Sequence, residues 1–331
     1  MKNTLNYLFE GNTLTRENAK VSLSELASGK YSEAEMASFL TVFNMRKIKP
    51  EELAGFRDAM LDLAIQVPLD EFNLIDVCGT GGDEKNTFNI STLSAFVVAG
   101  AGAKVVKHGN YAVSSPCGSS NILEHYGYKF STDISKIKNE LSKTNFCYLH
   151  APLFHPAMKN IGPVRRALKV KTFFNILGPM VNPARPANQL IGVYSEEVQQ
   201  LYAGVYKQVG VNHIIVYSID GYDEISLTGD FKYISLEKNE MLSPDSLGLL
   251  KIQQSQINGG NTVQESAKIF VDILNGKGTD AQNNVVIANS AMALKCYYPD
   301  KPLDECISKA WESLTEKKAG TIFKKLLELQ N

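Results

Sequence analysis

The chain has 331 residues, of which 44% are hydrophobic and 21% are charged, and its formal net charge is −1. This length exceeds one typical domain and allows a large buried core, so we expect two domains. The near-neutral charge argues against a nucleic-acid binder that relies on bulk positive charge, although it is compatible with a local basic pocket.

Residues 1–66 are predicted to be entirely helical and to form a small domain. Ser32 and Glu35 make a capping box ahead of apolar residues at helical spacing. Pro50, followed by two glutamates, is typical of the first position of another helix. No alternation of polar and apolar residues, as in a strand, interrupts this region.

From residue 72 onwards, candidate strands alternate with candidate helices. This alternation predicts an α/β domain over 72–331 with a mostly parallel central sheet. The strands are expected at 74–78, 103–107, 146–150, 189–194 and 213–219. The helices between them are expected at 91–100, 119–126, 133–143, 155–168 and 196–209. Helices at 264–275, 282–297 and 303–329 are expected to end the chain.

Residues 76–92 are the most informative stretch of the sequence. A strand-like run breaks abruptly into Gly79-Thr80-Gly81-Gly82 before a helix begins. Glycines let consecutive backbone amides converge on one anion, most often a phosphate. The spacing matches neither the P-loop nor the dinucleotide-binding fingerprint. Asp83 would repel phosphates, so it favours a ligand that also carries hydroxyls or a cation. A plain glycine turn is the alternative.

The glycine loop continues into a segment of amide and hydroxyl side chains, Asn86-Thr87-Phe88-Asn89-Ile90-Ser91-Thr92. Asn89 or Ser91 is suited to cap the next helix. The same side chains are also suited to bind phosphate oxygens and a metal-bound water. The two roles are compatible with each other.

A second candidate loop follows the next strand, at residues 107–120. Lys107-His108-Gly109-Asn110 is followed by Ser114-Ser115-Pro116-Cys117-Gly118-Ser119-Ser120, and a helix is expected to begin near Ile122. Open α/β sheets bind ligands at the carboxyl ends of their strands. Lys107 offers a positive charge for a phosphate, and the serines offer hydroxyls to a second anion. The alternative is a serine-rich turn with a helix cap.

Asp223 and Glu224 lie in a loop after the strand expected at 213–219. Adjacent carboxylates in such a loop are candidate Mg²⁺ ligands, because Mg²⁺ usually takes one or two protein carboxylates beside substrate phosphates. A solvated acidic pair is the alternative when these two residues are considered alone. The two phosphate-type loops favour the metal site.

Arg165 and Arg166 share one predicted helix with His155. As neighbours they point in different directions, so at most one of them can face a pocket. An inward arginine suits a planar carboxylate, which it binds through two parallel hydrogen bonds. A surface salt bridge is the alternative for either arginine, and a helix cap is the alternative for His155. The stiff turn at 175–183 could wall an apolar slot.

The cysteines and the N-terminus indicate the cellular compartment. Cys78, Cys117, Cys147, Cys296 and Cys306 show no paired or metal-binding spacing, which is typical of reduced thiols. No hydrophobic signal core and no run of roughly 18 apolar residues is present. We therefore expect a soluble, cytoplasmic protein with no membrane or nucleic-acid partner.

Taken in order, these segments resemble the anthranilate phosphoribosyltransferase family of tryptophan biosynthesis. The resemblance covers nearly the whole chain, and the ordered set of motifs is far more specific than any one of them. The motifs are Gly79-Thr80-Gly81-Gly82-Asp83, Asn89-Ile90-Ser91-Thr92, Lys107-His108-Gly109-Asn110, Ser114-Ser115 with Gly118-Ser119, Val164-Arg165, Phe174-Asn175-Ile176-Leu177-Gly178-Pro179 and Asp223-Glu224.

The resemblance implies a nucleoside-phosphorylase-like fold, usually as a homodimer. The helical domain would be joined by a helix from about 155–185, and the active site would lie in the cleft between the domains. The substrates would be phosphoribosyl pyrophosphate (PRPP) and anthranilate, and the cofactor would be Mg²⁺, bound by Ser91, Asp223 and Glu224. Lys107, Asn110 and Arg165 would be the catalytic residues.

The resemblance also implies which residues bind each substrate. Asn110 and Arg165 would bind anthranilate, with His108 and Pro179 along its path. PRPP would be held by Gly79, Gly82, Asp83, Thr87, Asn89, Ile90, Ser91, Thr92, Lys107, Ser115 and Ser119.

The sequence departs from the family pattern at three places. Tyr111 replaces the usual arginine, Lys171 stands where arginine is common, and the usual Gly-Ser-Ala-Asp reads Gly118-Ser119-Ser120-Asn121. These changes bear on the phosphate and dimer contacts. They leave the acidic pair and Arg165 intact.

The implied reaction is a metal-assisted displacement of pyrophosphate by the neutral aromatic amine, without a covalent enzyme intermediate. One rival is a pyrimidine nucleoside phosphorylase, which would not need the acidic pair at 223–224. The other rival is a non-catalytic relative that binds a polyanion. Neither the net charge nor the intact glycine loop favours that second rival.

Overall fold

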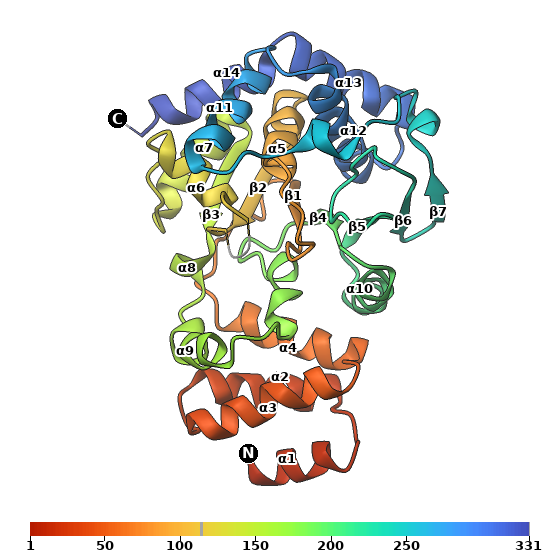
Figure 1. The fold of residues 1–331 in the computed structure, drawn as a ribbon. Coiled ribbons are helices and arrows are strands. Elements are labelled where there is room, and N and C mark those ends of the chain that lie inside the picture. The colour runs from red at the N-terminus through yellow and green to blue at the C-terminus, as the bar shows by residue number, and fades with distance from the viewer. Residues whose placement is uncertain (113–114, 331) are drawn as a thin grey trace.

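The computed structural model describes residues 1–112 and 115–330 (Figure 1). Four N-terminal helices form a layer at one end of the molecule, and a sheet flanked by helices forms the larger part (Figure 1). The predicted α/β class with an N-terminal helical region is confirmed. The four helices are α1 (Lys2–Phe9), α2 (Arg16–Ala27), α3 (Glu33–Met45) and α4 (Pro50–Asp62).

The helical layer forms for the reasons that its sequence indicates. The capping box of Ser32 and Glu35 is present at the start of α3, and Pro50 is the first residue of α4. Phe39, Phe43 and Phe56 pack edge to face in its interior, with ring centroids 5.1–5.8 Å apart. Such aromatic contacts add to the stability that their burial provides.

Seven strands form one sheet in the order β3-β2-β1-β4-β5-β6-β7. The first five strands are parallel, and β6 and β7 extend the sheet in antiparallel fashion. Strands β2 and β3 lie on one side of β1 and the next strands, β4 and β5, lie on the other, so the β1–β4 boundary is the switch point where open sheets bind ligands. The strands are β1 (Leu74–Gly79), β2 (Lys104–Gly109), β3 (Phe146–His150), β4 (Asn188–Gly192), β5 (Asn212–Ser218), β6 (Phe231–Ser235) and β7 (Asn239–Leu242).

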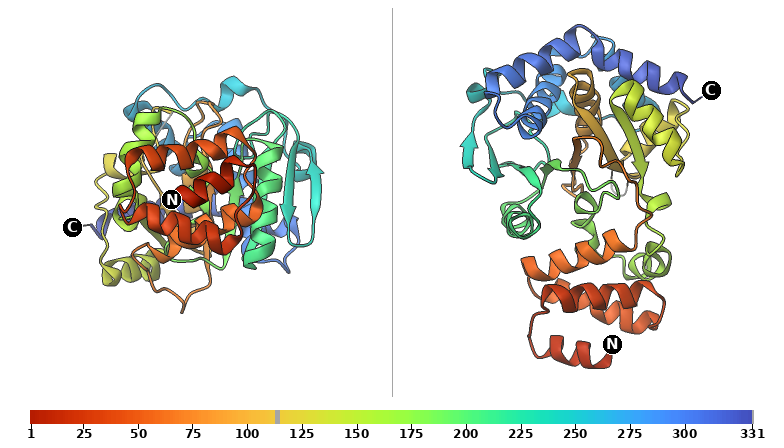
Figure 2. Two further views of the ribbon diagram at one scale, coloured as in Figure 1. Left: turned by 90° about the horizontal axis from the view of Figure 1, so that it is seen from below. Right: turned by 180° about the vertical axis from the view of Figure 1, so that it is seen from behind.

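Helices cover both faces of the sheet (Figure 2). One face packs on α5 (Ile90–Gly100), α11 (Val263–Leu274), α12 (Asp280–Tyr297), α13 (Leu303–Thr315) and α14 (Lys318–Glu328). On the other face, β4 and β5 share a core with α10 (Glu196–Val209) and the N-terminal helices. A smaller core there joins β1, β2 and β3 to α7 (Ile134–Thr144) and α8 (Ala151–Phe154).

Three helix predictions need correction. The helix expected at 155–168 begins later, as α9 (Met158–Leu168), and the short helix α8 precedes it, because Pro156 disfavours helical geometry at His155. The helix expected at 303–329 is α13 and α14, separated by Lys317 with φ 59°. The helix expected at 119–126 is confirmed as α6 (Ser119–His125), but it begins at Ser119 with Gly118 at its N-cap and not near Ile122.

The pair β6–β7 and four short 3₁₀ turns were not predicted. Strand β7 is exposed along most of its length, so it lacks the alternation of buried and exposed residues that indicates a strand. The 3₁₀ turns are η1 (Phe173–Asn175), η2 (Gly178–Met180), η3 (Pro244–Leu247) and η4 (Gln254–Ile257).

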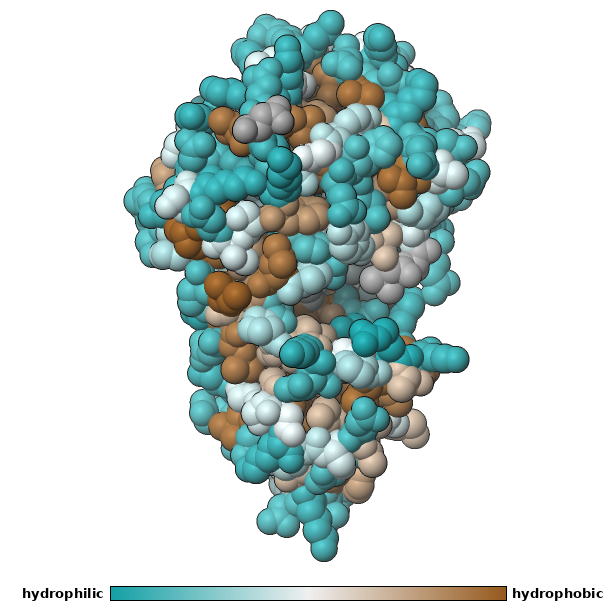
Figure 3. Space-filling view, turned by 90° about the vertical axis from the view of Figure 1, so that its left-hand side faces the viewer, coloured by the Kyte–Doolittle hydropathy of each residue, from teal (hydrophilic) through white to brown (hydrophobic). Residues whose placement is uncertain are grey.

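The outer surface mixes hydrophilic and hydrophobic residues on the side that carries α6 to α9 (Figure 3). Among the described residues, no helix is both long enough and apolar enough to cross a bilayer. All five cysteines are buried and free, as the sequence predicts.

Candidate active site

The glycine loop lies at the switch point of the sheet. The Thr80 amide donates to the Gly192 carbonyl across the boundary of β1 and β4, at 2.9 Å. Gly81 and Gly82 have φ values of 67° and 77°, which L side chains rarely adopt. A Cβ atom at Gly79 would lie 2.2 Å from Asp223 Oδ2, so glycine is required there for the acidic loop to approach.

Asp223 and Glu224 face the glycine loop, and the alternative of a solvated pair is wrong. Asp223 is buried, and its Oδ2 accepts the Gly81 amide at 2.6 Å. Glu224 Oε1 accepts the Ser91 amide at the start of α5 at 2.8 Å. One oxygen of each carboxylate thus fixes the backbone of the loop that is predicted to bind phosphates.

Carboxylates outnumber cations at this point. Burial and the nearby Asp83 raise the pKa of Asp223 to about 8. Burial and Asp223 also raise the pKa of Glu224 well above its usual value. Carboxylate and hydroxyl oxygens are the ligands that Mg²⁺ prefers, so Asp83, Asp223, Glu224 and Ser91 fit that ion. Within the described residues, no three His, Cys, Asp or Glu side chains form a metal site by themselves.

Lys107 is a buried residue of strand β2. The strand extends to Gly109, beyond its predicted end, so Lys107 and His108 belong to the strand. The buried Lys107 Nζ donates to the Val77 carbonyl at 2.6 Å and to Ser91 Oγ at 3.5 Å. Its charge is therefore fixed between the glycine loop and the start of α5.

The second loop contacts the first one directly. Asn89 Nδ2 donates to the Cys117 carbonyl at 3.0 Å. Asn89 is the N-cap residue of α5, but its side chain makes this contact between loops instead of a cap hydrogen bond. The two loops expected to bind phosphates therefore meet, as the sequence analysis requires. Ser115 is half-buried in the second loop, and Ser114 lies outside the described residues.

The segment between the glycine loop and α5 is held from the C-terminal side. Asn86 Nδ2 donates to the Gly260 carbonyl at 2.8 Å, and Thr87 pairs with Asn258 in an isolated β-bridge. Thr87, Asn89 and Ser91 are half-buried, whereas Ile90 and Thr92 are buried. Thr87 and Ser91 therefore remain partly accessible to a ligand.

Asn110 and Ser119 form the other end of the second loop. Asn110 is exposed, and its Oδ1 accepts the Tyr111 amide at 2.8 Å. Ser119 is half-buried, and its hydroxyl donates to the Asn110 carbonyl at 3.3 Å. Asn121 accepts the Ala112 and Gly118 amides at 3.1 and 3.0 Å, so this departure from the family pattern shapes the loop itself.

Arg165 belongs to a separate cluster on α9. Its guanidinium lies 4.9 Å from the Phe174 ring centroid, and its Nη2 is 3.5 Å from Asn175 Oδ1. Arg166 is exposed, so only one of the two arginines faces inward, as predicted. Within the described residues, no hydrogen bond joins Arg165 or Asn110 to the glycine loop.

His108 and His155 form a buried pair beside the 3₁₀ turn that contains Pro179. Their Nε2 atoms lie 3.2 Å apart. Burial lowers the pKa of His155 to about 4 and that of His108 well below its usual value, so both imidazoles are neutral at pH 7. The prediction that His155 is a helix cap is partly right, since it ends α8.

The contacts of Lys171 with the glycine loop were not specified by the sequence, and Asp76 and Asn182 were not among the predicted site residues. Lys171 Nζ donates to the Gly82 carbonyl at 3.0 Å and pairs with Glu84 at 2.9 Å. The buried Asp76 accepts hydrogen bonds from Asn182 Nδ2 at 2.9 Å and from the His108 amide at 3.3 Å. Only the position of Asp76 in the first strand of the sheet and that of Asn182 in the stiff turn hinted at this pairing.

Two carboxylates, a buried lysine and two loops that are predicted to bind phosphates meet at the switch point of the sheet, and this arrangement fits an enzyme that transfers a group from a phosphorylated sugar. Two family models agree with this class. Residues 2–64 match the helical bundle domain of a glycosyl transferase family, and residues 71–320 match the α/β domain of that family. The chain belongs to this glycosyl transferase family and, within it, to the anthranilate phosphoribosyltransferases.

Curated relatives and solved structures support this assignment over the full length. The anthranilate phosphoribosyltransferase of Christiangramia forsetii is 52% identical to this chain, and the match covers 99% of each protein. That of Bacteroides thetaiotaomicron is 47% identical, and the match covers 100% of each protein. The crystal structure of the Thermus thermophilus enzyme has a TM-score of 0.93 at 30% identity, covering 98% of both chains. The Saccharomyces cerevisiae enzyme in complex with PRPP and Mg has a TM-score of 0.89 at 27% identity, covering 98% of this chain and 96% of that one.

Proposed function

We propose that this chain transfers the phosphoribosyl group of PRPP to the amine of anthranilate. The products are N-(5-phosphoribosyl)anthranilate and pyrophosphate, in tryptophan biosynthesis. The observation that carries the proposal is the direct contact of the acidic pair with the glycine loop, through Asp223 and Gly81 and through Glu224 and Ser91. A pyrimidine nucleoside phosphorylase would not need this pair.

PRPP binds where the two loops meet. The amides of Gly79 and Gly82, the hydroxyls of Thr87, Ser91 and Thr92, and the Lys107 ammonium provide donors for phosphate oxygens. The Asn89–Cys117 contact keeps the loops together, which brings Ser119 and Ser115 to the same ligand. Asp83 and Ile90 complete this set beside the sugar.

Ser91, Asp223 and Glu224 would hold Mg²⁺ beside the phosphates of the substrate. The excess of buried carboxylates supports this assignment, because a divalent cation compensates their charge. When bound, Mg²⁺ would stabilise the negative charge of the departing pyrophosphate. The S. cerevisiae relative was solved with Mg, both with PRPP and as a variant.

Anthranilate binds between Arg165 and Asn110. The Arg165 guanidinium is charged and half-buried, so it suits the planar carboxylate of the substrate. The neutral pair of His108 and His155 and the buried Pro179 supply a weakly polar path for the aromatic ring. Structures of the S. cerevisiae relative with 4-fluoroanthranilate are among the similar ones.

The reaction depends on positioning and charge. Loss of pyrophosphate builds positive charge on the anomeric carbon and negative charge on the leaving group. Lys107 and the glycine-loop amides stabilise that negative charge, and Arg165 and Asn110 hold the amine in line with the anomeric carbon. The aromatic amine is neutral near pH 7, so no general base is needed to activate it.

One assay tests the function. Purified protein is mixed with PRPP and anthranilate, and the fluorescence of anthranilate is followed with Mg²⁺ and with excess EDTA. We expect the signal to fall only with Mg²⁺, and not when Asp223 and Glu224 are both replaced by Ala. A folded wild-type protein that leaves anthranilate unchanged under all conditions would refute the proposal.

The proposal extends to the organisation of the chain. The helical domain comprises residues 1–66 with a contribution from 155–185, and residues 72–331 form the PRPP-binding domain. In support, the buried residues Ile161, Val164 and Phe173 belong to the same core as α1 to α4. The substrates then meet between the two domains. The buried, free cysteines suit a reducing cytoplasm.

We further propose a homodimer that forms through the helical domain. A groove of about 520 Å³ lies between α1 and α3, and it is lined mainly by apolar residues such as Leu8, Phe9 and Met45. Phe9 and Met45 are 64% and 82% exposed and both line this groove, so they form one apolar patch, a feature that marks protein–protein interfaces. Sedimentation should give twice the chain mass, and Met45→Glu should yield the monomer. A monomeric wild type would exclude the dimer.

A further inference from the structure

A row of four polar side chains runs behind Ser119, away from the loop surface. Ser119 Oγ lies 2.8 Å from Tyr148 OH, Tyr148 OH lies 2.7 Å from Ser120 Oγ, and Ser120 Oγ lies 2.8 Å from His150 Nδ1. Tyr148, Ser120 and His150 are all buried, whereas Ser119 is half-buried. Ser119 is therefore the one member that a ligand can contact.

Strand pairing places this row beside the phosphate-binding lysine. Tyr148 of β3 pairs with Lys107 of β2, and His150 pairs with Gly109. A Cβ atom at Gly109 would lie 2.4 Å from both Ser119 Oγ and Tyr148 OH, so glycine leaves the room in which the two hydroxyls meet. The row is thus part of the wall of the second loop.

The hydrogens of the row can point in only one consistent direction. Ser119 donates to the Asn110 carbonyl, which can only accept. Each hydroxyl has one proton, so Ser119 must accept from Tyr148, and Tyr148 must accept from Ser120. Ser120 in turn accepts from His150 Nδ1. Each member of the row therefore donates to the next one in the direction of Ser119, and Ser119 is the final donor.

We propose that Tyr148 is a positioning residue that orients the Ser119 hydroxyl to donate to a phosphate oxygen of PRPP, with Ser120 and His150 fixing Tyr148. The inference rests on the proposed function, because it takes PRPP as the ligand of Ser119. A phosphate oxygen would replace the Asn110 carbonyl as the final acceptor. The row also gives a role to Ser120, which stands where the related motif has alanine.

The test removes single hydroxyls and measures steady-state kinetics. Tyr148→Phe keeps the ring in the core but loses the donor to Ser119. We expect the KM for PRPP to rise about three- to tenfold, the usual effect of one hydrogen bond, with kcat and the KM for anthranilate changed less than about twofold. Ser120→Ala, which frees Tyr148 to rotate, should raise the same KM by about twofold.

Tyr128→Phe is the matched control. Tyr128 is also a buried tyrosine of this core, but its hydroxyl donates to Glu140 at 2.7 Å and not to the row. Its KM for PRPP should equal that of the wild type. An equal rise in both tyrosine variants would assign the effect to core packing and overturn the inference.

A double-mutant cycle separates positioning from other roles of Tyr148. Ser119→Ala removes the hydroxyl that Tyr148 orients, so adding Tyr148→Phe should raise the KM for PRPP no further. If the two substitutions raised the KM for PRPP by the product of their single effects, the inference would be overturned. An unchanged KM for PRPP in Tyr148→Phe would also overturn it. In either case an active wild type leaves the proposed function standing. A wild type that is inactive with PRPP and anthranilate would refute the proposed function instead.

Discussion

At the scale of single residues, α9 shows how one position decides the role of an arginine. Arg165 and Arg166 are adjacent, yet Arg165 lies against Phe174 and Asn175 and Arg166 is exposed. The rotation of about 100° between neighbours on a helix separates them. The pair therefore provides an internal control for any test of anthranilate binding.

Arg165→Ala should weaken the use of anthranilate by about 1.5–3 kcal/mol, the usual worth of a hydrogen bond to a charged group. This corresponds to a fall of roughly ten- to hundredfold in kcat/KM for anthranilate, with the KM for PRPP unchanged. Arg166→Ala should leave both parameters at their wild-type values. An unchanged KM for anthranilate in Arg165→Ala would reject the assignment.

The raised pKa of Asp223 makes stability depend on pH in the metal-free protein. The folded-state pKa is about 8, above the value of about 3.9 for an unfolded aspartate. Between these values the folded state keeps a proton that the unfolded state has released. The contribution to stability is therefore complete below about pH 4, declines as pH rises, and stops declining above about pH 8.

Thermal unfolding in EDTA between pH 5 and pH 9 measures this effect. The wild-type melting temperature should fall towards pH 8, and Asp223→Asn should show a shallower fall because it carries no such proton. Asp300→Asn changes an exposed aspartate and should keep the wild-type slope. Equal slopes in wild type and Asp223→Asn would show that Asp223 is ionised in the metal-free protein.

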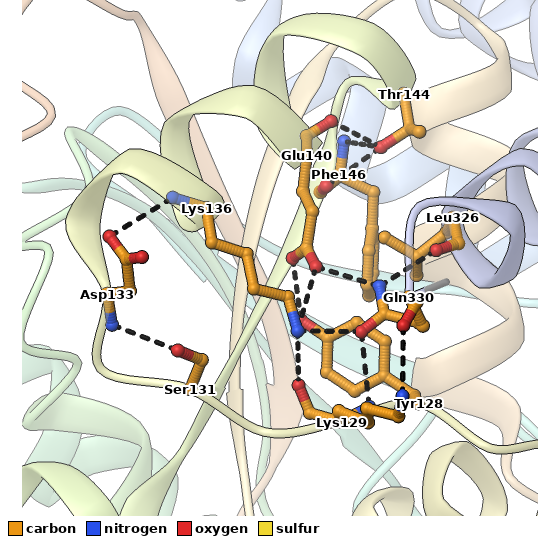
Figure 4. Close-up of polar contacts among 10 residues, drawn as sticks. All are labelled: Tyr128, Lys129, Ser131, Asp133, Lys136, Glu140, Thr144, Phe146, Leu326 and Gln330. Atoms are coloured by element: carbon orange, nitrogen blue, oxygen red, sulfur yellow. Dashed lines mark hydrogen bonds and ion pairs between the residues drawn. The ribbon is translucent and has the colours of Figure 1, made fainter.

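At the scale of secondary-structure elements, the chain end after α14 is anchored in the core by Gln330 (Figure 4). Its Nε2 donates to Glu140 of α7 at 2.9 Å, and its Oε1 accepts from Lys136 Nζ at 2.7 Å. Glu140 is only 1% exposed and also accepts the Tyr128 hydroxyl. A single side chain after α14 thus bonds two side chains of α7, one of which is the buried Glu140.

Gln330→Ala should lower the free energy of unfolding by about 1–3 kcal/mol, because buried Glu140 loses a donor that water cannot easily replace. Gln208→Ala removes an exposed glutamine and should change stability by less than about 0.5 kcal/mol. Urea unfolding of both variants measures the difference. Equal stabilities would show that the anchor contributes nothing.

The pattern of apolar residues was sufficient to predict the parallel strands and most helices, because β1 to β5 are largely buried runs between turn residues. Local signals also located the helix starts at Ser32 and Pro50. They could not locate β7, whose residues are mostly exposed, or the break at Lys317, which depends on a left-handed backbone in a polar residue. These features depend on tertiary contacts.

The candidate site, like the fold, was predicted in part from the sequence. The rule that parallel strands present ligands at their carboxyl ends was enough to bring together the glycine loop, Lys107 and the acidic pair. Contacts such as Lys171–Gly82 and Asn182–Asp76 join residues 89 and 106 positions apart and carry no motif. Only the folded chain places these side chains.

At the scale of the whole molecule, the helical layer and the sheet share one core. Helix α4 packs against α10, where a Cβ atom at Gly204 would lie 2.7 Å from the Pro50 side chain. Consecutive residues of β4, Leu190 and Ile191, belong to the cores on opposite faces of the sheet. The two regions are therefore coupled through the strands, and neither buries its apolar surface alone.

This coupling predicts cooperative unfolding of the chain. In urea, the fluorescence of Trp311, the single tryptophan, reports on α13, whereas circular dichroism at about 222 nm reports on all helices. The two transitions should coincide. Gly204→Leu forces α10 away from Pro50 and should lower both midpoints equally, although Trp311 is an exposed residue of α13, which packs in the other core region. Separate midpoints, or a fluorescence curve that Gly204→Leu leaves in place, would mean that the helical layer unfolds on its own.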